Sequence, residues 1–214
     1  MKIGIIGTGN IGSTLVHLFA DAGHQVKMAN SRGPDSLAAL AAETGTSAVQ
    51  VREAVRDVDL VVVTIPLRNI TQLPADLFAG VAKDVAVVDT CNYYPRERDG
   101  KIAAIEEGMP ESRWTEQLLK HPLIKAFNNI YAGHLKSMGK PAGSPGRIAL
   151  PVAGDDAKAK ALVMQLIDAM GYDPVDAGPL DESWRQQPGT PVYAADFDAA
   201  GVRRALELAS RERK

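Results

Sequence analysis

The sequence is almost free of cysteine, because Cys91 is the only one among 214 residues. A single thiol excludes an internal disulfide framework and is typical of proteins from a reducing compartment. The chain also lacks a large excess of charge of either sign, since its formal net charge is −2. This balance gives no reason to expect a nucleic acid or an anionic membrane surface as partner.

Long apolar runs are absent as well. None approaches the roughly 20 residues that a membrane-spanning helix needs, and Lys2 is followed by strand-forming residues and glycines rather than by the apolar core of a signal peptide. We therefore expect a soluble, cytoplasmic protein without a membrane partner. Hydrophobic residues make up 45% of the chain and charged residues 23%, which is enough apolar surface for a sizeable core.

The strongest pattern stands at the start of the chain. Residues 3–6 form an apolar run that predicts a buried strand, and residues 13–22 have the spacing of a helix. Between them lies a G-x-G-x-x-G turn made of Gly7, Thr8, Gly9, Asn10, Ile11 and Gly12. In this context the first glycine permits a tight turn, the second lets backbone approach a pyrophosphate, and the third lets helix and strand pack closely. The turn and the following helix N-terminus therefore predict a dinucleotide site.

Strands and helices alternate along most of the remaining chain. Further strands are predicted over residues 25–29, 47–50, 60–63, 85–88, 123–127, 148–153 and 172–176. The run Leu60-Val61-Val62-Val63 is apolar throughout, which is typical of a central parallel strand that is covered on both faces. The alternation predicts an α/β fold with a Rossmann-type, doubly wound and mostly parallel sheet.

Two parts of unequal size are expected. Residues 1–178 are predicted to form the nucleotide-binding domain with added strands, and residues 179–214 a short C-terminal extension made of a loop and a helix over 199–210. The basic residues at the end of the chain are expected to be a solvated tail; they are Arg211, Arg213 and Lys214.

The tip of the second strand indicates which nucleotide binds. An NAD-specific fold places an acidic residue there to hold the ribose hydroxyls, but this chain has Asn30, Ser31 and Arg32. A carboxylate would repel a 2′-phosphate, whereas a hydroxyl and a guanidinium bind one well, and Thr8 in the first turn is placed to donate one more hydrogen bond. Asp35 is expected to cap the next helix. The pattern favours NADP over NAD.

The carboxyl ends of the later strands should line the nicotinamide end of the groove. These ends are residues 64–66, 89–92 and 126–129, and they offer amides, hydroxyls and apolar surface. The sequence indicates no Ser-His-Asp set, no metal-ligand cluster and no lysine–carboxylate pair. Reducing a carbonyl or imine normally needs a positioned acid, whereas hydride transfer between two cofactors needs mainly proximity and orientation. No catalytic residue is therefore assigned.

Three single residues near these ends are candidates for a part in the chemistry. Cys91 is interpreted as a small packed residue rather than a reactive thiol. Asp89 either orients a group in the site or caps a loop. His134 has the best position of the four histidines to face the groove, although a structural role is favoured for it too.

Several motifs taken in order resemble a known family. The chain is similar to the deazaflavin-dependent NADP oxidoreductases and to the cytosolic reductase domain of the six-transmembrane metalloreductases. The resemblance covers residues 1 to about 184. The motifs that carry it are Gly7-Thr8-Gly9-Asn10, Asn30-Ser31-Arg32, Thr64-Ile65-Pro66, Lys125-Ala126-Phe127-Asn128, Val152-Ala153-Gly154-Asp155 and Asp176-Ala177-Gly178-Pro179-Leu180.

The resemblance implies a cofactor, a reaction and an assembly. It implies NADPH with its 2′-phosphate on Thr8, Ser31 and Arg32, and hydride transfer between NADP and a small redox partner, either a deazaflavin (factor 420) or a flavin. Soluble members of the family are often homodimers. The motifs and the resemblance together predict these cofactor-binding residues: Gly7, Thr8, Gly9, Asn10, Ile11, Gly12, Asn30, Ser31, Arg32, Thr64, Ile65, Pro66, Asn92, Ala126, Phe127 and Asn128.

Two other classes of protein share some of these features. Pyrroline-carboxylate reductases and β-hydroxyacid dehydrogenases share the glycine turn but need a long helical C-terminal domain, and only one clear helix follows Phe197. From a different class, the chain could be an NADPH-binding sensor or subunit without catalysis of its own. The sequence segment 89–95 and the region after Gln186 depart from the family pattern, so the sequence leaves the acceptor open.

Overall fold

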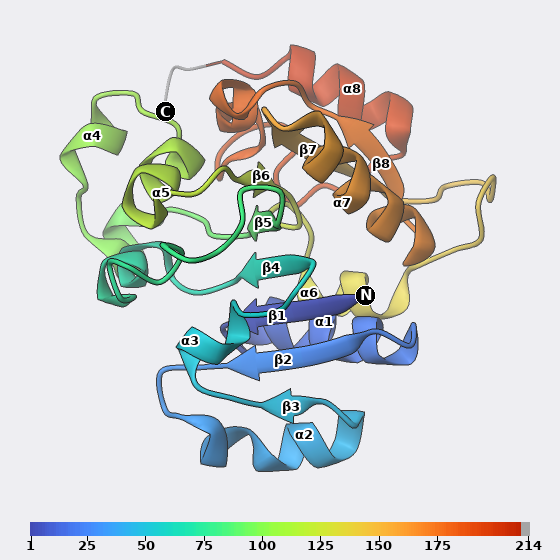
Figure 1. Ribbon diagram of the computed structural model, residues 1–214. Coiled ribbons are helices and arrows are strands. Elements are labelled where there is room, and N and C mark those ends of the chain that lie inside the picture. Colours follow the sequence, from blue (N-terminus) through green and yellow to red (C-terminus); the bar gives the residue numbers. More distant parts are fainter. Residues whose placement is uncertain (211–214) are drawn as a thin grey trace.

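The structure, a computed structural model, describes residues 1–210, and the predicted basic tail at residues 211–214 lies outside them. Figure 1 shows the helices arranged on both sides of one twisted sheet. The strands are β1 Lys2–Ile6, β2 Gln25–Ala29, β3 Ser47–Ala48, β4 Leu60–Val63, β5 Ala86–Asp89, β6 Ile124–Lys125, β7 Ala149–Gly154 and β8 Asp173–Asp176. The α-helices are α1 Asn10–Asp21, α2 Ala38–Thr44, α3 Val51–Ala54, α4 Ala103–Glu106, α5 Glu111–Leu119, α6 Ala132–Ser137, α7 Ala157–Ala169 and α8 Ala199–Glu207. Within residues 1–210 there are also four short 3₁₀ or π turns: η1 Pro34–Leu37, η2 Leu67–Gln72, η3 Pro95–Asp99 and η4 Leu180–Gln186.

The eight strands form one sheet in the order β3-β2-β1-β4-β5-β6-β7-β8. All neighbours run parallel except β6 and β7, which are antiparallel. The predicted Rossmann-type α/β fold with a mostly parallel sheet is therefore confirmed. From β1 the chain adds β2 and β3 on one side and then returns to add β4 on the other side. The switch point therefore lies between β1 and β4, and open α/β sheets bind their ligands at such a point.

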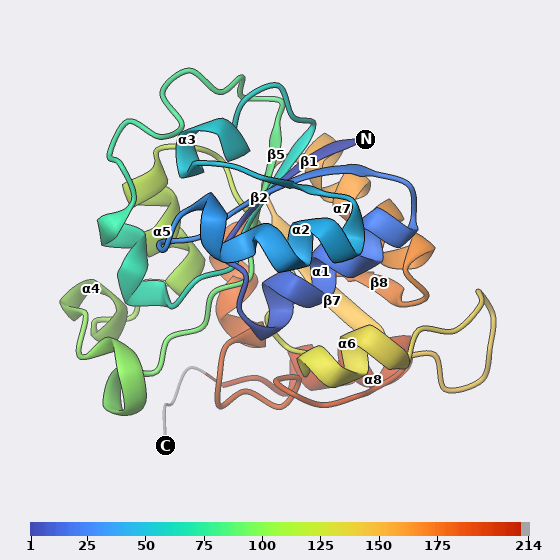
Figure 2. The ribbon, with the colours of Figure 1, turned by 90° about the horizontal axis from the view of Figure 1, so that it is seen from below.

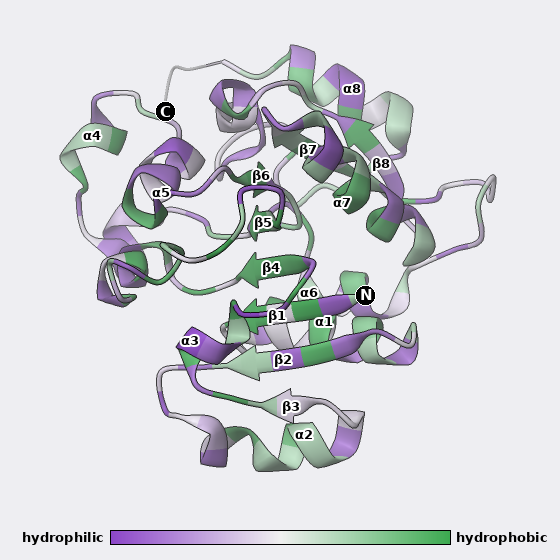
Figure 3. Ribbon diagram, in the orientation of Figure 1, coloured by the Kyte–Doolittle hydropathy of each residue, from purple (hydrophilic) through white to green (hydrophobic). Residues whose placement is uncertain are grey.

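Alternate residues of the central strands point into two different cores. On β4, Leu60 and Val62 join one cluster while Val61 and Val63 join the other. The first core lies under α1, α6 and α7, and Figure 2 shows α1 and α6 side by side on that face. The second core lies under α3, η2, α4 and α5. This double burial explains why the strands are hydrophobic along their whole length, as Figure 3 shows for β4 and β5.

The outer face of β7 and β8 has a smaller core of its own. Val175 on β8 packs there with Val202 and Ala205 of α8 and with Val192 from the preceding loop. α8 begins after Asp198, whose carboxylate accepts a hydrogen bond from the N–H of Gly201 at 2.8 Å. The last helix is thus held on the sheet by an apolar stripe and a side-chain cap.

Candidate cofactor and acceptor site

The glycine turn joins β1 to α1 as predicted, and its three glycines have three different surroundings. Gly7 has a φ of +105°, and a Cβ there would lie 2.2 Å from the carbonyl oxygen of Thr64. A Cβ on Gly12 would lie 2.1 Å from the carbonyl oxygen of Gly7. A Cβ on Gly9 would meet no atom within 4 Å. The first and third glycines are therefore required by the protein's own backbone, whereas the second borders open space.

That open space adjoins the N-terminus of α1, which begins at Asn10. Within residues 1–210 no side chain caps this end of the helix, and its first turn has no acidic residue. The hydroxyl of Ser13 donates instead to the carbonyl of Gly9, at 2.8 Å. Unpaired N–H groups and the positive end of the helix dipole favour an anion at this position. The surroundings of Gly9 and this helix end therefore have the features of an anion site.

The tip of β2 is tied to the glycine turn by Asn30. Its amide nitrogen lies 3.4 Å from the hydroxyl oxygen of Thr8 and 3.0 Å from that of Ser36. Its amide oxygen accepts a hydrogen bond from the N–H of Arg32 at 2.9 Å. Ser31 and Arg32 are exposed beside this connection. The structure therefore brings the predicted 2′-phosphate residues to one place, with Asn30 as the organiser of the loop.

The expected cap by Asp35 is wrong. Asp35 lies inside the first turn of η1, and no capping hydrogen bond is formed by a side chain of the described residues at that end. Ser36 bonds there instead, because its hydroxyl donates to the carbonyl of Gly33 at 2.7 Å. The φ of +87° at Gly33 turns the loop so that the Ser36 hydroxyl reaches both this carbonyl and Asn30.

The predicted nicotinamide end is held by a pair of amide side chains. Asn92 follows β5 and Asn128 follows β6; Asn92 donates to the carbonyl of Asn128 at 2.9 Å, and Asn128 donates to the side-chain oxygen of Asn92 at 3.1 Å. Thr64, Ile65 and Pro66 lie half-buried at the end of the neighbouring β4. These residues meet at one edge of the sheet, as expected for strand carboxyl ends.

Two of the predicted residues have little side chain to offer at this edge. Ala126 and Phe127 are buried in the first core, so a ligand at the sheet edge would meet their backbone. Phe127 has a φ of +60°, a conformation that bulky residues rarely adopt. This turn ends β6 after two residues and directs Asn128 toward Asn92. Backbone held in such a conformation is concentrated at functional sites.

A buried ion pair that was not predicted from the sequence lies directly beneath this edge. Lys125 on β6 pairs in register with Asp89 on β5, and its ammonium lies 3.2 Å from the Asp89 carboxylate, with both side chains fully buried. The ammonium also donates to the carbonyl of Cys91. Ser112 donates to the carboxylate at 2.7 Å. The statement that no lysine–carboxylate pair is present is therefore wrong; the signal was two charged residues at the ends of adjacent apolar strands.

Asp89 therefore acts mainly as an internal anchor. Its second carboxylate oxygen accepts a hydrogen bond from the N–H of Cys91 at 2.9 Å, so Asp89 and Lys125 together fix the backbone that leads to Asn92. Cys91 is buried, and this burial, with the Asp89 carboxylate close by, raises the pKa of the thiol well above its usual value. This environment supports the interpretation of Cys91 as a packed residue.

Two tyrosines and a glutamine complete the polar side of the site, and none was predicted. Gln186 at the end of η4 donates to the side-chain oxygen of Asn128 at 2.9 Å. The hydroxyl of Tyr193 lies 3.4 Å from the amide nitrogen of Asn92 and is hydrogen-bonded to the hydroxyl of Tyr94. The C-terminal segment thus reaches back over the ends of β5 and β6.

His134 lies on α6 with a partner that suits a structural role. Its Nδ1 atom lies 2.6 Å from a carboxylate oxygen of Asp196, and its ring stands edge-on to Tyr131. The backbone carbonyl of His134 accepts a hydrogen bond from Tyr172 at 2.7 Å.

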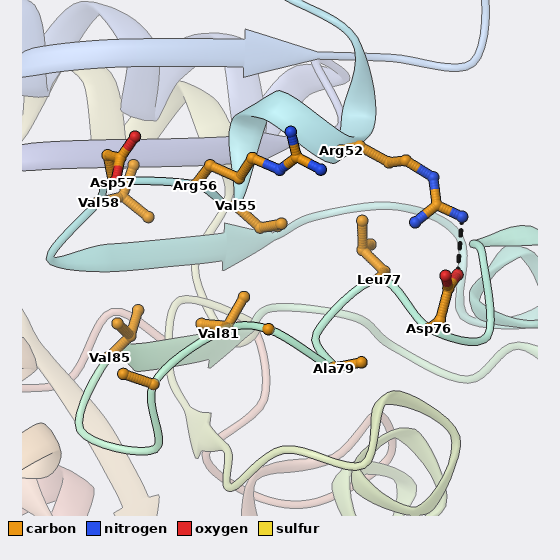
Figure 4. A pocket seen from close by; sticks show the side chains of 12 residues that line it. Arg52, Val55, Arg56, Asp57, Val58, Asp76, Leu77, Ala79, Val81 and Val85 are labelled. Atoms are coloured by element: carbon orange, nitrogen blue, oxygen red, sulfur yellow. Dashed lines mark hydrogen bonds and ion pairs between the residues drawn. The ribbon is translucent and has the colours of Figure 1, made fainter.

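A hollow of about 670 Å³ lies elsewhere, between α3 and the segment before β5 (Figure 4). Asp57 and Val58 before β4 and Val85 before β5 line it near the amino ends of these strands, and none of the predicted cofactor residues does. Arg52 and Asp76 close one side through an ion pair of 2.7 Å. Because ligands of open α/β sheets lie at the carboxyl ends, this hollow does not mark the cofactor site.

Two further features are absent from the described residues. Within residues 1–210, no group of three or more His, Cys, Asp or Glu side chains is arranged to hold a metal ion. No helix in the same range combines the length and hydropathy that a membrane span requires.

Comparison with known proteins gives the chain its family. The family model described as NADP oxidoreductase, coenzyme F420-dependent, matches residues 2–93. The crystal structure of the hypothetical protein SMa0349 from Sinorhizobium meliloti is 30% identical, with a TM-score of 0.77 over 92% of this chain and 95% of that one. A candidate F420-dependent NADP reductase from Arthrobacter sp. FB24 has the same fold at 23% identity, with a TM-score of 0.68 over 86% of this chain and 87% of that one.

A further relative matches only one segment. The protein YjhV of Escherichia coli (strain K12) is 49% identical over 71 residues, which are 33% of this chain and 52% of YjhV. The matched segment thus spans about half the length of that protein. The fold, the glycine turn and these similarities define an NAD(P)-dependent oxidoreductase of the Rossmann type. Within that class, the chain belongs to the family of NADP oxidoreductases described as coenzyme F420-dependent.

Proposed function

We propose that this protein transfers hydride between NADP(H) and a flavin-type ring, either a deazaflavin or a flavin. The observation that carries the nucleotide part is the open space at Gly9, which faces the uncapped N-terminus of α1. A ligand with a pyrophosphate fits this space, and bound NADPH would supply the hydride. The family of the chain supports NADP in particular.

The residues toward the adenosine end distinguish the two nicotinamide cofactors. Thr8 lies beside the loop that carries Ser31 and Arg32, and residues 30–34 at the tip of β2 include no Asp or Glu. Arg32 would hold the 2′-phosphate by charge-assisted hydrogen bonds, with the two hydroxyls as further donors. Asn30 keeps the loop in place, because it bonds to both Thr8 and the backbone of Arg32.

The residues toward the nicotinamide would position the rings. Gly7, Asn10, Ile11 and Gly12 form the turn below the pyrophosphate, and the ends of β4, β5 and β6 flank the nicotinamide. The residues proposed at these strand ends are Thr64, Ile65, Pro66, Asn92, Ala126, Phe127 and Asn128. Amide side chains fix orientation without taking part in hydride transfer, which needs mainly proximity between two rings.

The acceptor is tested by mixing the protein with NADPH and one ring system at a time. A deazaflavin, riboflavin, FMN and FAD make a suitable panel, with the loss of NADPH absorbance as the measurement. We expect oxidation of NADPH by at least one of them. Binding of NADPH without oxidation by any of them would contradict the proposal and would support an NADPH-binding sensor or subunit.

We also propose that the chain acts in the cytoplasm, as its composition suggests, and that it forms a homodimer, as the family resemblance implies. Light scattering on the purified protein would give the mass of two chains, and a mass of one chain would contradict this part.

A further inference from the structure

Tyr94 and Tyr193 come from segments that are 99 residues apart in the chain, and their hydroxyls are hydrogen-bonded to each other. The pair lies beside the proposed nicotinamide end, because the Tyr193 hydroxyl is 3.4 Å from the side-chain nitrogen of Asn92. Asn92 is in turn bonded to Asn128, so both phenols belong to the polar wall of the acceptor side.

The protein holds each of these tyrosines in place from its own side. The N–H of Tyr94 donates to Asp99 at 2.8 Å, and the guanidinium of Arg98 lies 5.1 Å from the centre of the Tyr94 ring. The N–H of Tyr193 donates to the carbonyl of Thr190 at 3.1 Å. Two phenols fixed independently and then brought together form an oriented pair rather than a chance surface contact.

Formation of the neutral reduced ring takes up a proton as well as a hydride. When a hydride adds to a conjugated ring, an electron pair moves onto a ring nitrogen or carbonyl oxygen, and that atom accepts the proton. The charged groups near Asn92 are unsuited to this task. Arg98 donates to the Asn92 carbonyl at 2.5 Å and pairs with Asp99, but a guanidinium does not give up its proton. Lys125 and Asp89 are fully buried and paired with each other. The phenols are half-buried and therefore in reach of both a ligand and water.

Tyr193 is also in the protonated state that a donor needs. Burial raises its pKa above the ordinary value, and the hydrogen bond with Tyr94 and the nearby Glu111 and Tyr131 act in the same direction. At neutral pH the phenol therefore carries its proton. Tyr94, which lies against Arg98 on its other side, is placed to pass on a replacement.

We propose that Tyr193 donates the proton that the acceptor takes up, and that Tyr94 relays a new proton from water. The inference rests on the proposed function. The bond that breaks at Tyr193 is O–H, the bond that forms is H–N or H–O on the reduced ring, and the electron pair of that new bond is the one displaced by the hydride. The Tyr193 phenolate then takes the proton of Tyr94, and water restores the Tyr94 phenol.

The first test compares rates in three variants that each remove one hydroxyl. Tyr193→Phe is expected to slow acceptor reduction about 100-fold or more, within the range for loss of a positioned acid, while NADPH affinity stays unchanged. Tyr94→Phe is expected to give a smaller loss. Tyr93→Phe is the control, since the Tyr93 hydroxyl bonds to Glu106 and to the N–H of Ile102; it should keep the wild-type rate. The solvent deuterium isotope effect should disappear in Tyr193→Phe.

The second test needs no turnover. Protein containing tyrosine labelled with carbon-13 at Cζ gives one nuclear magnetic resonance signal per phenol, and the three variants assign the signals of Tyr93, Tyr94 and Tyr193. Addition of NADP⁺ followed by a flavin should shift the Tyr193 and Tyr94 signals and leave the Tyr93 signal in place. An unchanged Tyr193 signal would overturn the inference, because it would put the pair away from the ligands.

The outcomes separate the inference from the function on which it rests. A wild-type chain that binds NADPH and reduces no member of the panel overturns the proposed function and the proton transfer with it. If wild type and Tyr193→Phe both reduce the acceptor at the same rate, the proton transfer alone is overturned. Slow reduction by Tyr193→Phe with normal NADPH binding supports both.

Discussion

Lys125 on β6 lies beside Asp89 on β5, and the ammonium and carboxylate are 3.2 Å apart with no access to solvent. The pair joins two neighbouring strands at the edge where the proposed acceptor side begins. The Ser112 hydroxyl and the Cys91 N–H donate to the carboxylate, and the Cys91 carbonyl accepts from the ammonium. A buried pair of this kind fixes the geometry of the backbone above it, here the segment that leads to Asn92.

Breaking this ion pair should lower the stability of the folded protein. Lys125→Met leaves a buried, unpaired carboxylate, so we expect a loss of about 3–5 kcal/mol in the free energy of unfolding, measured by urea denaturation. Asp76→Asn is the control, because it breaks the exposed pair with Arg52 and should cause no measurable change. Equal stability of Lys125→Met and wild type would show that the pair is not formed.

Substitutions in the first glycine turn should affect NADPH binding and folding differently. Gly9→Ala adds a Cβ that meets no protein atom within 4 Å, so we expect native stability and an NADPH affinity at least about tenfold weaker, or ~1.4 kcal/mol. Gly12→Ala places its Cβ 2.1 Å from the carbonyl oxygen of Gly7 and should destabilise the fold. Gly133→Ala, also without neighbours, should change neither. Calorimetric titration measures the NADPH affinity, and thermal unfolding measures the stability. Full NADPH affinity in Gly9→Ala would contradict a pyrophosphate site at this turn.

The thiol of Cys91 should be unreactive while the protein is folded. It is 2% exposed, and burial raises its pKa, so very little thiolate is present at neutral pH. A disulfide reagent added at pH 8 is expected to label no thiol in the native protein and one thiol per chain in urea. Rapid labelling of the native protein would show that Cys91 reaches the site surface.

Alkaline pH should destabilise the wild-type protein more than Tyr193→Phe. The pKa of Tyr193 is raised in the folded state, chiefly by burial, so the unfolded chain loses this proton first, as the pH passes about 10. The folded state then binds more protons than the unfolded state, and the free energy of unfolding falls as the pH rises. The stability that Tyr193 contributes is thus present below pH 10 and is lost above it. Urea denaturation at neutral pH and near pH 11 measures the difference; an equal fall in both proteins would contradict it.

The sequence predicted most of the parallel half of the fold because its strands are long apolar runs. β1, β2 and β4 have the predicted residues or nearly so, and β5 is shifted by one. Asp156 caps α7, accepting from the N–H groups of Lys158 and Ala159 at 2.9 Å. Its neighbour Asp155 accepts from the N–H of Leu180 at 3.0 Å.

Other features depend on contacts that no local pattern reports. β6 is only two residues long because the chain turns away at Phe127, whereas the apolar run predicted five. η2 was not predicted, and α1 begins at Asn10, three residues before the predicted start. The contact between Tyr94 and Tyr193 joins residues far apart in the chain, so it has no signature in either segment. The boundary at residue 178 and the role of each cofactor residue stay predictions.

The affinity for NADPH relative to NADH tests the central claim most directly. Titration of wild type and Arg32→Ala with each nucleotide gives the ratio, and Arg56→Ala, an exposed arginine beside the distant hollow, is the matched control. We predict at least about tenfold tighter binding of NADPH, or ~1.4 kcal/mol, in wild type and Arg56→Ala, and near-equal affinities in Arg32→Ala because NADPH binding alone weakens. Equal affinities in wild type, or an unchanged ratio in Arg32→Ala, would contradict a 2′-phosphate site at the tip of β2.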